Sequence, residues 1–204
     1  MLLSQRLNSN LNLRRKEADT PLQQYEKGEE IAVLDSDIWQ VYRGVVQLSR
    51  VKQDGSEVVV GWVAANGTFG NCFDASCGSY RAIALGNVYA RRYCQADVIR
   101  YPLLARQFLT QYSDRLIKSE HLLSIIAVRK VEERLKQLLL MLKEEIGQSV
   151  GDQVRLQVRF THQHLAEAIC TTRVTVTRIL GDFQNRGFIY LDSERHIVFK
   201  NLSE

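Results

Sequence analysis

The chain has 204 residues, of which 45% are hydrophobic, and this is enough to bury a core in one large domain or two small ones. Its 27 basic and 23 acidic residues leave a formal net charge of +4, which is compatible with a nucleic-acid partner but too small to indicate one. No stretch approaches the ~18 apolar residues of a membrane-spanning helix, and the N-terminus is too polar for a signal peptide. We therefore expect a cytoplasmic protein with no membrane partner.

Four cysteines, Cys72, Cys77, Cys94 and Cys170, are scattered along the chain. None has the paired C-x-x-C spacing of a zinc site, so we predict no metal site. We expect mostly buried, reduced thiols, and a redox role for Cys72 and Cys77 is the alternative. An enzyme with Cys94 or Cys170 as nucleophile and a histidine as base is a rival class. No cysteine lies in a recognisable nucleophile motif, so we predict no catalytic residues.

The first half of the chain is expected to be a polar arm followed by a β-rich domain. Residues 1–20 carry many charges and few apolar anchors. Between 21 and 105, short apolar runs alternate with turn residues, which is typical of an antiparallel sandwich or barrel. The strongest hairpin signal is Asp54-Gly55, because both residues tolerate the positive φ of a tight turn.

Residues 106–147 are expected to form a long helical segment, either one helix or a broken pair, because neither proline nor glycine interrupts it before its last residue. Leu109, Leu116 and Leu123 recur every seven residues, which predicts a coiled-coil seam and hence a parallel homodimer. An amphipathic core helix without dimerisation is the alternative. Further along, an apolar face suited to packing against a domain is formed by Leu135, Leu138, Leu139, Leu142 and Ile146.

A hinge or domain boundary is predicted at Gly147, where IGQSVGD combines a helix-ending glycine with turn formers. Residues 148–204 then show the pattern of a strand, two short helices and a hairpin. Thr161 and Thr172 have the type and position of helix N-caps. The second helix carries an apolar stripe of Val176, Ile179, Leu180 and Phe183.

Two short helices and a two-stranded wing are what a winged helix-turn-helix requires, and Arg173 and Arg178 fall outside the apolar stripe of the second helix. Arginine offers a planar fork of donors that fits guanine O6 and N7, and threonine offers a hydroxyl and a methyl group. A solvated arginine face is the alternative interpretation. In this two-helix context we favour contact with the bases or phosphates of double-stranded DNA.

The run FTHQHLAEAICTTRVTVTRILGDFQNRGFIYLDSERHIVF resembles the winged helix-turn-helix of the CRP/FNR transcription regulators, most closely that of their cyanobacterial nitrogen-regulator (NtcA) branch. RLIKSEHLLSIIAVRKVEERLKQLLLML is similar to the dimerisation helix of the family, and YEKGEEI and VYRGVVQLSRV are similar to strands of its effector domain. The resemblance implies an α+β protein with an antiparallel, cupin-like β-roll over residues 21–105, a long dimerisation helix over 106–147 and a winged helix-turn-helix over 148–204.

The resemblance also implies which residues meet DNA. Arg173, Val174 and Arg178 are the expected base-contacting residues. The residues expected near phosphates or base edges are Thr161, Gln163, Thr172, Thr175 and Thr177. Valine cannot accept a hydrogen bond from cytosine, as the glutamate of CRP-like members does. Val174 therefore favours a palindrome of NtcA-like half-sites that contain GTA.

Two departures from the family pattern have consequences. Cys170 stands where the family has the glycine of the turn, and a left-handed conformation there would cost about 1 kcal/mol. In the first domain, Phe69-Gly70 is followed by Asn71 rather than by the glutamate that holds a ribose, and no suitable Arg-Ser pair follows. These residues argue against cyclic AMP as an effector.

The nitrogen-regulator resemblance suggests 2-oxoglutarate instead. The implied ligand set is the backbone of Phe69, Gly70, Asn71 and Cys72 together with Arg115 and Glu120 from the long helix. The second arginine of the family aligns near Gly86, so one charge-assisted contact is missing unless Arg81, Arg91 or Arg92 replaces it.

Two alternatives to an effector site remain open. Arg115 and Glu120 also suit a solvent-exposed charged pair on a helix. In that case the β-roll would sense nothing and would serve a constitutive DNA-binding dimer as a platform for another protein, such as RNA polymerase.

Overall fold

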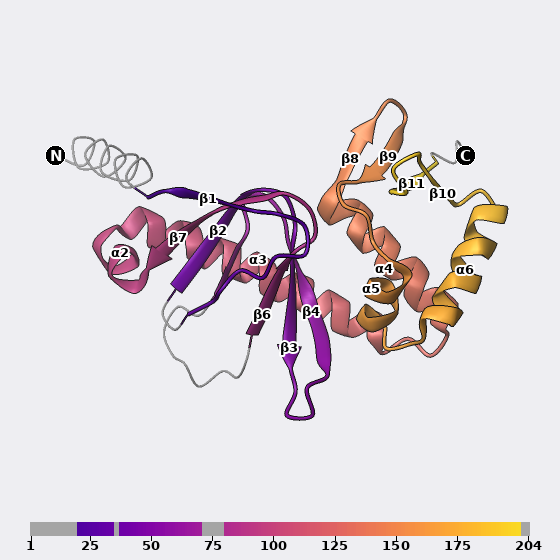
Figure 1. Ribbon diagram of the computed structural model, residues 1–204, viewed down its shortest axis with the longest axis horizontal. Coiled ribbons are helices and arrows are strands. Elements are labelled where there is room, and N and C mark those ends of the chain that lie inside the picture. The colour runs from indigo at the N-terminus through magenta and orange to yellow at the C-terminus, as the bar shows by residue number, and fades with distance from the viewer. Residues whose placement is uncertain (1–19, 35–36, 71–79, 201–204) are drawn as a thin grey trace. The chain divides into compact units, whose positions relative to one another are not determined.

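The computed structural model describes residues 20–34, 37–70 and 80–200 (Figure 1). The chain divides into two compact units. The first contains the chain up to Val51 and Trp62–Ile117, and the second contains Lys52–Gly61 and the chain from Lys118 onwards.

The strands of the first half of the chain form two antiparallel sheets, with the orders β1-β7-β2-β5 and β4-β3-β6. Their bounds are β1 Leu22–Tyr25, β2 Asp37–Arg43, β3 Val46–Val51, β4 Glu57–Val63, β5 Thr68–Gly70, β6 Tyr80–Ala84 and β7 Val88–Cys94. Non-consecutive neighbours in both sheets mean that the chain crosses between them, as in a roll rather than a meander.

The hairpin predicted at Asp54-Gly55 joins β3 to β4, and the prediction is confirmed. The turn is longer than the tight turn we expected, because the Lys52 N–H donates to the Ser56 carbonyl at 2.8 Å across five residues. Only Gly55 of the pair has a positive φ, of 79°. Asp54 contributes its carboxylate instead, which accepts the Ser56 N–H at 2.9 Å.

Two helices follow the sheets, α2 (Gln95–Arg100) and α3 (Pro102–Ile126). The first turns of α3 pack on the sheet of β2 and β7 through a buried cluster of Ile38, Tyr93, Val98, Leu104 and Phe108. The rings of Tyr93 and Phe108 meet edge to face, with their centroids 5.3 Å apart. This cluster joins the start of the long helix to the β-roll.

The long helical segment is a broken pair rather than one helix. It consists of α3 and α4 (Val131–Ile146), separated by residues 127–130. Neither glycine nor proline marks the break, which is why the sequence left both arrangements open. The seam leucines of α3, Leu109, Leu116 and Leu123, are 60–69% exposed.

The second unit contains α4 as well as the elements that follow it: β8 (Gly147–Val150), β9 (Gln153–Leu156), α5 (His162–Ala168), α6 (Arg173–Asn185), β10 (Ile189–Leu191) and β11 (Ile197–Phe199). The strands form one sheet in the order β10-β11-β9-β8. All five residues of the predicted apolar face of α4 are buried, and this helix contacts β8, β9 and α6. Gly147 caps the end of α4 and is the first residue of β8, and a hinge at this residue stays a prediction.

The predicted α+β fold is confirmed, but the expectation of mostly buried cysteines is wrong for the two that the structure describes. Cys94 and Cys170 are free and exposed, because one caps a helix and the other occupies a turn. Cys72 and Cys77 lie outside the described residues. Among the described residues, no helix is both long and apolar enough to cross a membrane.

Candidate nucleic-acid interface

The helices α5 and α6 begin at the two threonines that the sequence predicted as caps. The side chain of Thr161 accepts the His164 N–H at 3.1 Å, and that of Thr172 accepts the Thr175 N–H at 3.2 Å. Each cap satisfies an N–H group that the first turn of a helix leaves without a partner. Helix α5 buries Leu165 and Ala166, and Ile169, which directly follows the helix, is buried as well.

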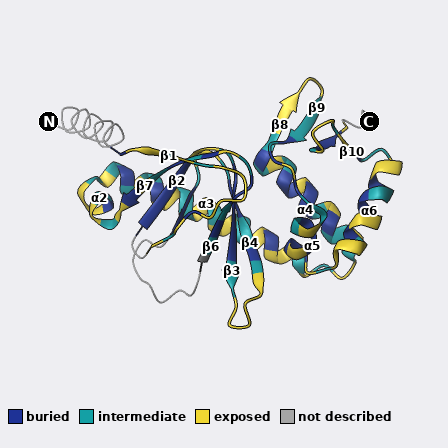
Figure 2. Cartoon of the chain, viewed as in Figure 1, coloured by how far each residue is buried: buried dark blue, intermediate teal, exposed yellow. Residues whose placement is uncertain are grey.

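Helix α6 has one buried side and one exposed side (Figure 2). The buried side is the predicted stripe of Val176, Ile179, Leu180 and Phe183. Arg173, Val174, Thr177 and Arg178 are exposed, and Val174 is 78% exposed. An apolar side chain so exposed beside two arginines is a surface that another molecule can cover.

Short contacts order the exposed side of α6. Arg178 forms an ion pair with Asp182 one turn further on, at 3.3 Å, and the arginine is 70% exposed. Such a surface pair contributes little to stability, so the guanidinium is free to exchange it for another acceptor. Gln163 of α5 donates to Glu167 at 2.8 Å. The structure thus gathers all eight sequence-predicted DNA contacts on α5, α6 and their caps.

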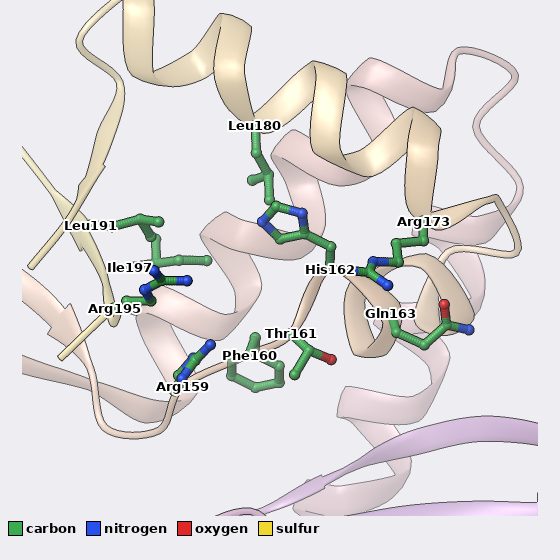
Figure 3. Close-up of a pocket in the computed structure, with 10 residues that line it drawn as sticks. All are labelled: Arg159, Phe160, Thr161, His162, Gln163, Arg173, Leu180, Leu191, Arg195 and Ile197. Carbon is green, nitrogen blue, oxygen red and sulfur yellow. The ribbon is translucent and has the colours of Figure 1, made fainter.

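The strands β10 and β11 and the turn between them form the wing. A cavity of about 390 Å³ opens between the start of α5, the start of α6 and this wing (Figure 3). Figure 3 shows His162, Gln163 and Arg173 on one side of it and Leu191, Arg195 and Ile197 on the other. Phe160 and Thr161 lie between the two sides, next to Arg159. Three arginines therefore line one cavity, together with a histidine and no carboxylate.

Sequence reasoning missed Arg159 and Arg195. One precedes the cap of α5 by two residues and the other lies in the wing turn, so they are 36 positions apart along the chain. A sequence signal exists for each alone, namely a basic residue beside a cap and a basic residue in a hairpin. Only the packing of the wing against the helices brings both to one cavity.

The wing turn contains a cluster of Asp192, Glu194 and His196 whose donor atoms lie close enough to hold a metal ion. Arg155 of β9 already occupies it, because its guanidinium pairs with both carboxylates. Burial acts to raise the pKa of Asp192, but hydrogen bonds from the His196 N–H and from Arg155 lower it below its ordinary value. The cluster therefore ties the wing to β9.

The residues expected to hold an effector are only partly described. Phe69 is buried and stacks on Trp39, and the Gly70 carbonyl accepts the Tyr112 hydroxyl at 3.2 Å. Arg115 lies over the Tyr112 ring at 5.0 Å. These contacts bring β5 and α3 together. Glu120 is exposed on α3, and Asn71 and Cys72 lie outside the described residues.

Arg81, Arg91 and Arg92 are the candidates to replace the second arginine that the family resemblance implies. Arg81 pairs with Glu30 at 3.0 Å, and Arg92 pairs with Asp37 at 3.2 Å. Arg91 instead donates to the Tyr42 hydroxyl at 3.3 Å and has no carboxylate partner within the described ranges. Of the three, Arg91 is therefore the one whose positive charge no described carboxylate neutralises, so it can pair with an anionic ligand.

Comparison with known proteins agrees with this arrangement. Residues 133–204 match the model of the Crp-like helix-turn-helix domain. Over 189 residues the chain is 33% identical to a global nitrogen regulator of Synechococcus elongatus, covering 87% of this chain and 85% of the relative. The chain belongs to the CRP/FNR family of transcription regulators. Its match with the nitrogen regulators confirms the resemblance that the sequence of α5, α6 and the wing indicated.

Solved structures of this family share the fold. A CRP/FNR regulator from Thermus thermophilus has a TM-score of 0.68 at 21% identity, covering 89% of this chain and 94% of its own. FixK2 from Bradyrhizobium japonicum has a TM-score of 0.73 at 19% identity, covering 89% of this chain and 93% of its own. The family consists of DNA-binding regulators rather than enzymes, as the lack of a nucleophile motif predicted.

Cys170 occupies the turn between α5 and α6 with a φ of 53°, so the turn keeps the left-handed conformation for which the family uses glycine. We predict that Cys170→Gly raises the free energy of unfolding by about 1 kcal/mol, because glycine adopts this conformation without a Cβ clash. Chemical denaturation of both proteins measures the difference. Cys170→Ala is the control and should give no such gain, since it keeps the Cβ atom. Equal effects of the two substitutions would contradict the prediction.

Proposed function

We propose that this regulator acts as a homodimer that reads a palindromic operator with GTA-containing half-sites. The observation that carries the proposal is the exposed side of α6, where Arg173, Val174 and Arg178 stand clear of the buried stripe. Such a helix fits the major groove of B-form DNA, and a two-fold dimer places two of them one helical turn apart. Val174 suits contact with a thymine methyl group and offers no acceptor to cytosine.

In this proposal some side chains contact the bases and others position the helix on the DNA backbone. Arg173 and Arg178 would supply the forked donors that guanine requires. Thr161, Gln163, Thr172, Thr175 and Thr177 would position the helix on the sugar–phosphate backbone or on base edges. The ion pair of Arg178 with Asp182 would open on binding, at little energetic cost.

Arg178→Ala tests the reading of bases. We expect a loss of roughly 1 to 3 kcal/mol in binding to a palindromic duplex with GTA half-sites, and a smaller loss on a scrambled duplex, because base contacts carry the sequence information. Fluorescence anisotropy with both duplexes at one salt concentration measures this. Lys136→Ala, which removes a charge from the exposed side of α4, is the control. Equal losses on the two duplexes would exclude Arg178 from base recognition.

The exposed leucines of α3 support the homodimer. Leu109, Leu116 and Leu123 follow a heptad spacing, and in the isolated chain each leaves a large apolar side chain in water. Burying them against the same helix of a second copy would remove that surface from water.

Leu116→Lys should weaken this dimer, because two ammonium groups would then face each other across the seam. Analytical ultracentrifugation should show a dimer for the native chain and a shift towards monomer for the variant. Ile117→Lys is a matched control, since Ile117 is 63% exposed but lies one residue off the seam. A variant at Leu116 that stays as dimeric as the control would count against the seam.

We further propose 2-oxoglutarate as an effector of the β-roll, in preference to cyclic AMP. Two observations favour a small dicarboxylate: Arg115 approaches β5 through Tyr112, and Arg91 has no carboxylate partner among the described residues. Arginine pairs with carboxylates through two parallel hydrogen bonds. The competing proposal is a β-roll without effector, which presents a surface to another protein such as RNA polymerase.

Isothermal calorimetry with 2-oxoglutarate separates the two proposals. We expect binding heat that disappears in Arg115→Gln, together with tighter binding of the palindromic duplex when the dicarboxylate is present. Glutarate, which has the same chain length but lacks the keto group, serves as the control ligand. No heat and no gain in DNA affinity would favour the effector-independent dimer.

A further inference from the structure

The cavity between α5, α6 and the wing concentrates positive charge that the rest of the unit does not neutralise. Arg159 and Arg195 are exposed at its edge, and Arg173 reaches it from the first turn of α6. Within the described ranges, none of these three guanidinium groups has a carboxylate partner, whereas Arg155, Arg178 and Arg186 of the same unit all do. Like charges gathered without counter-charges are stabilised when an anion enters.

The wing holds Arg195 at this cavity in a conformation that arginine rarely adopts. Its φ is 63°, in the left-handed region, which costs a residue with a Cβ atom about 1 kcal/mol. The turn is nevertheless well anchored, because the Arg195 N–H donates to the Asp192 carbonyl at 2.9 Å and the Asp192 N–H donates to the His196 carbonyl at 3.1 Å. Glycine would suit the backbone of this turn better, but it would remove the cation that Arg195 brings to the cavity.

His162 adds a group whose charge depends on pH. Its Nδ1 atom lies 2.7 Å from the Thr177 hydroxyl, which itself donates to the Arg173 carbonyl at 2.9 Å. A hydroxyl has one proton to donate, so Thr177 must accept from His162, and Nδ1 carries hydrogen in both charge states. The atom that gains or loses a proton is therefore Nε2.

We propose that this cavity is a binding site for a phosphate of the DNA backbone, in which Arg159 and Arg195 are permanent cations and His162 binds more strongly when protonated. The inference rests on the proposed DNA binding and adds to it a contact that is independent of base sequence. Phosphate oxygens suit a cluster of guanidinium and imidazolium donors that contains no carboxylate. The site lies beside the cap of α5 and the first turn of α6, where the backbone that flanks a major-groove helix runs.

The sign of the pH dependence follows from the surroundings of His162. Burial, and then the charge of Arg173, lowers the pKa of this imidazole below its ordinary value. Arg159 and Arg195, which face the same cavity, are also positive. A bound phosphate would reverse this repulsion and raise the pKa, so DNA binding would take up a proton. The added affinity would be complete below the pKa of the free protein and lost as pH rises through that of the complex.

Anisotropy titrations of the full chain with palindromic and scrambled duplexes test the permanent cations. We expect Arg159→Gln and Arg195→Gln each to weaken binding about tenfold on both duplexes and to reduce the slope of log affinity against log salt by about one. Lys136→Gln removes one charge from the same unit, away from the cavity, and should do neither. Arginine variants that match this control while the native chain binds DNA would overturn the phosphate site but leave the proposed function intact. A native chain that binds neither duplex would overturn both.

His162 is tested by the pH dependence. Between about pH 5.5 and 8, native affinity should fall as pH rises, by up to about tenfold for each unit of pKa difference. His162→Gln should bind DNA with an affinity that no longer changes with pH and that equals the low affinity of the native chain at high pH. His162→Arg should also be independent of pH, but with the high affinity of the native chain at low pH. NMR titration of the His162 ring should show a pKa that rises with duplex and changes little with inorganic phosphate. A full pH dependence in His162→Gln would overturn the role of this histidine, and an equal rise with inorganic phosphate would assign the cavity to a free anion.

Discussion

The candidate nucleic-acid interface of this regulator depends on the burial of one apolar stripe on α6. Val176, Ile179, Leu180 and Phe183 are each 5% exposed or less. They hold the helix against its own unit, where α6 contacts α4, α5 and β10. Because a helix is rigid about its axis, burying one side fixes the direction of the other. Arg173, Val174 and Arg178 face outwards for that reason, whatever their own side chains prefer.

The same packing positions the wing. Phe183 meets Phe188 edge to face at 5.4 Å, and Phe188 meets Phe199 of β11 at 5.8 Å. These rings link the end of α6 to the last strand, while Arg155 ties the wing turn to β9. A wing fixed at both ends can hold Arg195 at the cavity in spite of its strained backbone. Side chains on rigid supports lose less conformational entropy when they bind a ligand.

The net charge of +4 would not by itself identify a DNA-binding protein. The electrostatic field at the surface depends on which of the basic side chains are neutralised by acidic partners. Acidic partners compensate Arg155 and Arg186 fully or in part, at places where they tie elements together. The arginines of the cavity are left uncompensated within the described residues. A protein of modest net charge thus presents a local positive field beside the exposed side of α6.

The first unit shares the family's fold and contains Phe69, Gly70 and Arg115, which the family resemblance implies as effector contacts. Gly70 and Tyr112 join β5 to α3, as a sensing mechanism that runs through the long helix would need. Arg91, which lies on β7, is one of the candidates to replace the second arginine that the family resemblance implies. A ligand could still recruit Arg91, since its partner is a tyrosine hydroxyl rather than a carboxylate.

The sequence by itself determined the features that depend on short-range periodicity and on residue type. Thr161 and Thr172 were recognisable as caps, the stripes of α4 and α6 followed the helical repeat, and TRVTVTR carried the family resemblance. Only the tertiary structure decided that the long helix breaks at 127–130, since no glycine or proline marks the place. It also decided that Arg159, His162 and Arg195 line one cavity. Packing between elements that are distant in the sequence brings such side chains together, and no local sequence pattern predicts it.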